Sequence, residues 1–124
     1  MDKDYILSVA KTIKSQLVAT ADPNVICSWG ISNPMATVFR NMPAFAFIVD
    51  GRLFKGGVLI ALNSSDLYEI YLVKSGSETC IFSEAYADQL VSIIDTAVES
   101  GNDPEEYEKF CQSQLGELVQ VITL

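Results

Sequence analysis

The side chains that carry most enzyme chemistry are sparse in this sequence, and histidine is absent altogether. A serine or cysteine nucleophile commonly needs an imidazole to move its proton near neutral pH, and most zinc sites outside four-cysteine clusters use one as a ligand. Asp50 and Asp66 are the best remaining carboxylates for acid–base chemistry because both lie at predicted strand ends. Turn chemistry explains both of them, so we predict no catalytic residue.

The cysteines and glycines point to no bound group either. Cys27, Cys80 and Cys111 are an odd number at wide spacing, which suits neither a disulfide framework nor a paired zinc site. We expect each to be a small buried hydrophobe in a reducing cytoplasm. The glycine pair 56–57 lacks the spacing and the following Ser or Thr of a phosphate loop, so we predict no metal and no cofactor.

The charge is acidic and uneven, with a net value of −8. From residue 75 onward ten acids face Lys109 alone. Such a field raises the local concentration of cationic partners, although acidity also serves solubility. A basic cluster of Arg40, Arg52, Lys55 and Lys74 near Trp29 is too small to neutralise a phosphate backbone, so direct nucleic-acid binding is not expected.

Length and composition predict one domain over residues 1–124. Apolar residues make up 49% of the chain, which favours a folded core over disorder. Charged residues interrupt every apolar run before the roughly 18 residues that a membrane helix needs. The acidic start of the chain does not match a secretory signal, so we expect a cytoplasmic protein.

The amino-terminal half predicts a helix followed by extended segments. Apolar residues recur at helical spacing over residues 4–21, and the Asp22-Pro23 pair should end that helix. Residues 24–32 are rich in β-branched and aromatic side chains and predict a strand. Residues 36–42 are left open as a short edge strand because the Asn-Pro and Met-Pro pairs at 33–34 and 42–43 enclose them.

The middle of the chain predicts an antiparallel meander. Asp50-Gly51 favours a two-residue hairpin turn between apolar arms, and the glycine pair 56–57 predicts a bulge or a close backbone approach. Residues 63–66 form the next turn through side chains that hydrogen-bond their own backbone, and residues 75–78 form another. Residues 79–82 are either a further strand or the lead into a helix.

Two helices should follow the sheet. An apolar stripe runs through residues 83–100. Residues 103–115 open with a helix start signal, an Asp cap followed by Pro and a Glu three residues after the cap. Their buried side would hold Tyr107, Phe110, Cys111 and Leu115. The apolar tail, residues 118–124, is left open as a helix end or a strand.

The predicted strands are apolar on both faces, which an antiparallel sheet with one solvated face would not be. Either the helices cover both faces, or they stack on one face and leave the other as a contact surface for a second copy. Tyr68 and Tyr71 point to opposite faces, so their burial distinguishes the two arrangements. The residues of the possible interaction surface are Tyr68, Tyr71, Trp29, Asp88, Asp95, Glu99, Glu105, Glu106 and Glu108.

The order of Trp29-Gly30, Asp50-Gly51, Lys55-Gly56 and the run LNSSDLYEIYLV before an acidic helix resembles small uncharacterised proteins of gut bacteria and their phages or mobile elements. The resemblance covers residues 25–99. It implies an intracellular accessory protein and no assigned activity, so it transfers no site residue.

Together these patterns predict an α+β fold with an N-terminal helix, a four- or five-stranded mainly antiparallel meander and two C-terminal helices. The function we expect is non-enzymatic: protein–protein contact, with self-association as a homodimer through an apolar sheet face and with a basic protein as a possible second partner. Two alternatives remain open. One is an acidic mimic of DNA that regulates a nucleic-acid-binding protein. The other is a ligand-binding domain or small enzyme whose pocket uses Tyr68, Tyr71, Asp66 or Arg52.

Overall fold

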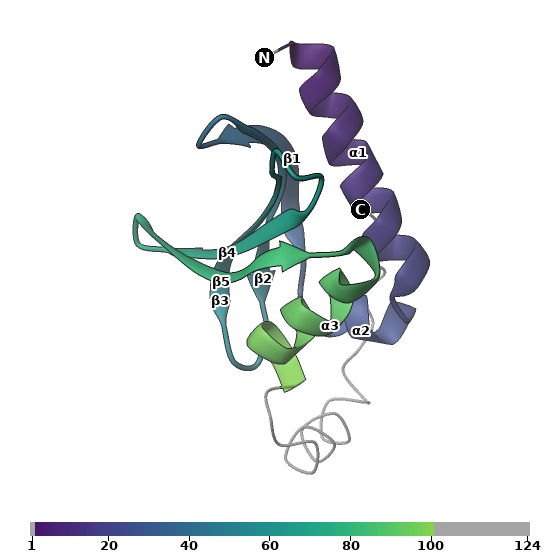
Figure 1. Cartoon of the computed structure of the whole chain (residues 1–124). Helices are drawn as coiled ribbons and strands as arrows, with labels where there is room; N and C mark the ends of the chain where they lie inside the picture. Colours follow the sequence, from purple (N-terminus) through teal and green to yellow (C-terminus); the bar gives the residue numbers. More distant parts are fainter. Residues whose placement is uncertain (1, 101–124) are drawn as a thin grey trace.

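The computed structural model describes residues 2–100, and it confirms the α+β fold with a five-stranded antiparallel meander. The strands follow one another across the sheet in chain order, and Figure 1 shows the helices on one side of it, with the β4–β5 hairpin extending away from them. The helical elements are α1 (Lys3–Thr20), α2 (Pro23–Ser28), the 3-10 turn η1 (Ala87–Gln89), α3 (Leu90–Asp95) and the π-helical turn η2 (Thr96–Ser100). The strands are β1 (Ser32–Phe39), β2 (Met42–Asp50), β3 (Lys55–Leu62), β4 (Tyr68–Lys74) and β5 (Ser77–Ala85).

Helix α1 forms as its spacing predicts. The Asp2 carboxylate accepts a hydrogen bond from the backbone N–H of Asp4 at 3.3 Å and caps the first turn. Its buried residues, Val9, Ala10, Ile13 and Leu17, form one stripe against the sheet. The predicted end at the Asp22-Pro23 pair is also confirmed, since the helix stops at Thr20.

The strand predicted over residues 24–32 is wrong, because α2 occupies most of that segment. The Asp22 carboxylate caps it by accepting from the N–H of Asn24 at 2.8 Å, and Pro23 occupies the first turn, where its missing N–H costs nothing. This local start signal outweighs the β propensity of the apolar residues that follow.

The hairpin between β1 and β2 turns earlier than the proline pairs suggest. Phe39 pairs with Met42, and Arg40 and Asn41 between them both have positive φ, 49° and 62°, as a two-residue hairpin turn requires. Residues 36–42 therefore contain the end of β1, this turn and the first residue of β2. Pro34 is tolerated because β1 is an edge strand with an irregular register next to it.

The hairpin at Asp50-Gly51 is confirmed, but its two-residue turn is wrong. Asp50 pairs with Lys55, and the N–H of Gly51 donates to the carbonyl of Phe54 at 3.1 Å across a longer loop. Glycine is required at position 51 by a close approach, since a Cβ there would lie 2.5 Å from the carbonyl oxygen of Val98 in η2.

The glycine pair 56–57 contains no bulge, because its pairing with β2 and with β4 continues without a shift. The alternative of a close backbone approach holds, since a Cβ at Gly56 would lie 2.8 Å from the carbonyl oxygen of Val73. The register shifts occur instead between β4 and β5.

The last two turns of the sheet follow the sequence. Asn63 Oδ1 accepts from the N–H groups of Ser65 and Leu67, at 2.9 and 3.1 Å, as a side-chain turn should. Ser75 and Gly76 form the next turn with positive φ values of 53° and 80°. Residues 79–82 belong to β5, which runs to Ala85, so the helical part of 83–100 begins later than predicted.

All the buried apolar residues of α1, α2, α3 and η2 belong to one core cluster with strand residues such as Phe47, Ile60 and Ile70. The helices in the described part of the chain therefore stack on one face of the sheet. Residues 103–115 and 118–124 lie outside the described residues. None of the described helices is both long and apolar enough to cross a membrane.

Candidate interaction surface

The strand residues that point away from the helices form a second cluster, which we call the open face. It contains Ala44, Leu59, Ala61 and Tyr71, with Phe39, Met42, Ala46 and Val73 packed against them. Every member comes from the sheet or its first turn. Within residues 2–100, then, strand residues cover this face by themselves.

Tyr71 lies near the centre of the open face and is 4% exposed. The Phe39 ring meets it edge-on, with ring centroids 4.8 Å apart and an interplanar angle of 61°. The Arg40 guanidinium carbon lies 4.9 Å from the Phe39 centroid and 5.4 Å from the Tyr71 centroid. This cation–π arrangement contributes about 0.5–1 kcal/mol at an exposed site, and it holds the guanidinium outward on the rings.

The register of the sheet explains this cluster. Ala44 pairs with Ala61, and both are buried although no described helix lies over them. Next to them, Ala46 pairs with Leu59, and Leu59 pairs with Tyr71. Small side chains in the middle of a sheet leave room for aromatic rings from neighbouring strands.

A hydrogen bond ties the Tyr71 hydroxyl to the same face. It donates to Glu69 Oε1 at 2.6 Å, and Asn63 Nδ2 donates to Glu69 Oε2 at 3.4 Å. The bond to the Glu69 carboxylate is the main cause that raises the pKa of Tyr71 to about 12, with burial and the Glu69 charge acting in the same direction. The hydroxyl is thus a fixed, neutral donor rather than a proton source near neutral pH.

Charges of both signs surround the cluster. Pairing places Lys55 opposite Asp50 on the open face, with Nζ 3.4 Å from the Asp50 carboxylate. Glu78 pairs with Val73 on the same face. Arg40 is exposed at the opposite end of the face from Lys55. The open face is therefore an aromatic and aliphatic patch with a mixed-charge rim.

The structure separates the three aromatic residues that the sequence suggested for an interaction surface. Tyr71 lies on the open face. Tyr68 lies in the helix-side core, where its hydroxyl donates to Gln16 Oε1 at 2.7 Å and burial raises its pKa. Trp29 is fully buried and its indole N–H donates to Asp95 Oδ1 at 2.9 Å, so it contributes to the core and not to a surface.

The suggested acids do not form a row either. Asp88 is exposed, but Asp95 accepts from the Trp29 indole. Glu99 is 1% exposed, and its Oε2 accepts from the N–H of Arg52 at 2.6 Å. Burial raises the pKa of Glu99. Glu105, Glu106 and Glu108 lie outside the described residues. Within residues 2–100, the suggested acids do not form a row with the spacing of DNA phosphates.

The possible ligand-binding residues also lie apart. Asp50 and Asp66 lie at opposite ends of β3, so the two carboxylates cannot line the same site. A cleft of about 570 Å³ includes Asp66, Arg40 and Glu69 in its lining, but Arg52 lies in the loop at the other end of the sheet. Cys80 is exposed on β5 and Cys27 is half-buried, so neither is the fully buried hydrophobe expected. Among residues 2–100 no three His, Cys, Asp or Glu side chains are grouped to hold a metal.

Sequence reasoning missed Phe39, Arg40 and Glu69 as members of this surface. The sequence identifies Arg40 only as a cation, because its position over the two rings depends on the turn that pairs Phe39 with Met42. Alternation holds within each strand but not across the turns, so the sequence alone does not place Phe39 on the face of Tyr71. No family model, no curated protein and no solved structure matches this chain.

Proposed function

We propose that this chain is a non-enzymatic protein that acts by protein–protein contact, and that two copies associate through the open face. The observation that carries the proposal is the exposed Arg40 guanidinium over the Phe39 and Tyr71 rings, on a sheet face without a described helix. Tyrosine and arginine are enriched at the energetic centres of protein interfaces. Ile48, exposed on the same face, extends the apolar area.

The charge pattern of the open face favours a second copy as the partner. A two-fold interface brings each residue of one copy against a different residue of the other, so a face with both signs can pair with itself. Arg40 and Lys55 supply the cations, and Glu69 and Glu78 supply acids on the same face. A uniformly acidic face would repel its copy.

The rest of the proposal concerns a further partner, the cellular compartment and the biological role. The acidic carboxyl-terminal third supports a basic protein as a further partner. The odd, widely spaced cysteines support a reducing compartment, the cytoplasm. The resemblance of residues 25–99 to small proteins of gut bacteria and phages supports an accessory role associated with mobile elements.

Light scattering over a hundredfold range of protein concentration tests the self-association. The wild type should shift from monomer to dimer as the concentration rises. Arg40→Glu should weaken the dimer at least tenfold, about 1.4 kcal/mol, because it removes the cation–π contact and adds an acid to the rim. Lys74→Glu is the matched control, since it makes the same charge change at an exposed position beside the β4–β5 turn.

Two results would overturn the proposal. One is a wild type that stays monomeric over the whole range. The other is an Arg40→Glu variant that dimerises as well as Lys74→Glu does. Circular dichroism on each variant separates a lost interface from a lost fold.

A further inference from the structure

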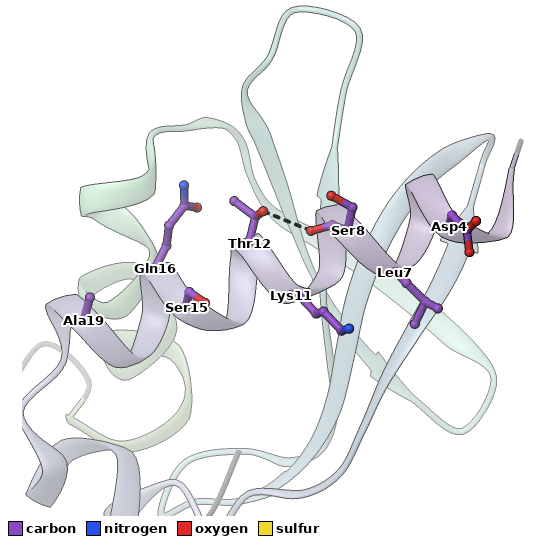
Figure 2. A pocket seen from close by; sticks show the side chains of 8 residues that line it. All are labelled: Asp4, Leu7, Ser8, Lys11, Thr12, Ser15, Gln16 and Ala19. Carbon is purple, nitrogen blue, oxygen red and sulfur yellow. Dashed lines mark hydrogen bonds between the residues drawn. The ribbon is translucent and has the colours of Figure 1, made fainter.

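The cleft of about 570 Å³ lies at the end of the sheet where the β1–β2 turn, the β3–β4 turn and the start of α1 line one hollow. Its lining includes Arg40 and Asn41 of the first turn, Ser64 and Asp66 of the second, and Tyr5 of α1. The larger hollow of about 750 Å³ along α1 is different, because Figure 2 shows that one helix supplies its whole lining. The cleft between the turns is enclosed by several elements, and its volume is typical of small-ligand pockets.

Three lining residues of this cleft have left-handed backbone conformations. Their φ values are 49° at Arg40, 62° at Asn41 and 61° at Asp66. Asparagine and aspartate tolerate this region, whereas a long side chain such as arginine is uncommon there. The favoured residues of such a hairpin turn are Asn and Gly, so turn formation alone does not account for arginine at position 40. Backbone strain of this kind is often found at ligand-binding sites, which indicates a role for the Arg40 side chain.

The Arg40 guanidinium is held in place without a hydrogen bond. Its carbon lies 4.9 Å from the Phe39 ring centroid and 5.4 Å from that of Tyr71. Among residues 2–100, no oxygen accepts a hydrogen bond from the guanidinium and no carboxylate forms an ion pair with it. A guanidinium presents five N–H donors in a fixed fork that matches a carboxylate in two parallel bonds. The cleft therefore contains an anchored group that can bind a carboxylate.

The opposite charge in the cleft comes from two acids. The Glu69 carboxylate accepts from the Tyr71 hydroxyl at 2.6 Å and from Asn63 Nδ2 at 3.4 Å, so these bonds fix its position. The Asp66 side chain is exposed and makes no hydrogen bond or ion pair within the described part of the chain. Its backbone N–H donates to the Asn63 carbonyl at 3.1 Å, which fixes the turn that carries it. An ammonium group, with three donors, can bind Asp66 without displacing an existing bond.

The two signs of charge limit the class of ligand. An anion bound to Arg40 would be repelled by the two carboxylates of the cleft, and a cation bound to those carboxylates would be repelled by Arg40. A ligand that carries both charges satisfies both sides. Met42, Pro43 and Leu62 also line the cleft and supply apolar surface for the rest of such a ligand.

We propose that this cleft binds a small zwitterion, an amino acid or a dipeptide, whose carboxylate pairs with Arg40 and whose ammonium group pairs with Asp66. The side chain of the ligand would lie on the apolar lining. One copy of the chain supplies every lining residue, so the proposal goes beyond self-association and does not rest on it.

Titration of the isotope-labelled full-length protein with leucyl-leucine, followed by two-dimensional NMR, tests the cleft. We expect saturable shifts at the backbone amides of Asn41, Ser64 and Asp66, with a Kd of about 1 mM or tighter. N-acetyl-leucyl-leucine lacks the ammonium group and leucyl-leucinamide lacks the carboxylate, so each should bind about tenfold more weakly or worse. Leucine, titrated in parallel, shows whether the amino acid or the dipeptide is the better ligand.

Two substitutions remove the proposed partners of the ligand one at a time. Asp66→Asn should weaken the binding of leucyl-leucine about tenfold or more, because it removes the carboxylate while asparagine still adopts the positive φ of the turn. Arg40→Gln should have the same effect by removing the guanidinium. Asp88→Asn and Lys74→Gln are the matched controls, since they make the corresponding changes at exposed positions outside the cleft and should bind as the wild type does.

The spectrum of each variant shows whether it is folded. The proposal is wrong if neither leucine nor leucyl-leucine gives a saturable shift, or if the blocked dipeptides bind as tightly as the free one. Shifts centred away from the two turns would also overturn it. The titration uses the lowest protein concentration of the light-scattering series. A protein that dimerises without binding the dipeptide fails this test alone, and one that binds the dipeptide as a permanent monomer fails only the test of self-association.

Discussion

The two faces of the sheet hide apolar side chains in different ways. On the helix side, large residues such as Phe47, Ile60 and Ile70 lie under α1, α2 and α3. On the open face, two alanines, Leu59 and Tyr71 are buried chiefly by neighbouring strand residues and by Phe39. Strands that are apolar on both faces therefore do not require helices on both, provided that small residues occupy the centre and aromatic rings lie over them.

The side-chain hydrogen bonds of the two faces differ in how far apart their partners lie in the chain. On the helix side they join elements far apart in the chain: Trp29 with Asp95, Tyr68 with Gln16, and Arg52 with Glu99. On the open face Tyr71 bonds to Glu69, two residues away. Long-range bonds hold the tertiary structure, whereas local ones fix a surface without tying it to another element. This difference supports a structural role for the helix side and a binding role for the open face.

The largest expected effect comes from adjacent residues of β3 that point to the two faces. Ile60→Ala should lower the free energy of unfolding by about 4 kcal/mol, because it leaves a cavity in a closed core. Leu59→Ala should cost about 2 kcal/mol, because the open face is shallow and water or a neighbouring ring can fill the space. Urea denaturation measures both.

Equal losses from Ile60→Ala and Leu59→Ala would contradict the comparison, because they would mean that the open face is as closed as the helix side. Ile60→Val is the control, and it should cost about 1 kcal/mol since it removes one methylene group from the same site.

The next effect concerns Glu99, whose buried carboxylate in η2 accepts a hydrogen bond from Arg52 in the β2–β3 loop. Burial is the main cause that raises the pKa of Glu99 above its ordinary value of 4.5. The folded state then binds more protons between the unfolded and folded pKa values. The stability that Glu99 contributes is therefore complete below about pH 4.5 and declines as pH rises through its folded pKa.

Glu99→Gln should remove this part of the pH dependence, because the amide oxygen can still accept from the N–H of Arg52 and carries no charge. Urea denaturation from pH 4 to pH 8 measures it. Asp88→Asn, at an exposed position, is the control and should leave the slope as in the wild type. A wild-type slope retained by Glu99→Gln would refute the assignment.

Much of the fold could be predicted from local patterns. The spacing of apolar residues placed α1, and turn chemistry placed the side-chain turn at Asn63 and the hairpin after Asp50. The β propensity of residues 24–32 gave a wrong prediction, because the Asp22-Pro23 pair caps and starts the helix α2 there. The length of the loop after Asp50 depended on Val98, which approaches Gly51 from the other end of the chain.

The candidate surface could be predicted only in part. Tyr71 follows from alternation within its strand, but its partners depend on the register that brings Leu59 and Phe39 beside it. The sequence suggests Trp29 as part of the possible interaction surface, but the residue is buried in the core. The buried indole N–H donates to Asp95, 66 residues along the chain, and no local pattern contains such a partner.

The smallest expected effect tests whether the hydrogen bond from Tyr71 to Glu69 on the open face contributes little to the stability of the fold. Glu69→Gln should lower the pKa of Tyr71 from about 12 toward the ordinary value of 10, because it removes the charged acceptor that is the main cause of the shift. Titration by NMR of ring-labelled tyrosine measures this. Since the raised pKa favours the neutral phenol in the folded state, the stability linked to it is complete below pH 10 and lost as pH rises through about 12. Near neutral pH Tyr71 is neutral in the folded and the unfolded state, and the amide of the variant still accepts from its hydroxyl, so the variant should unfold within about 1 kcal/mol of the wild type. A loss of several kcal/mol in the free energy of unfolding would mean that the open face also stabilises the fold. The contrast between a stabilising helix side and a binding open face would then be wrong.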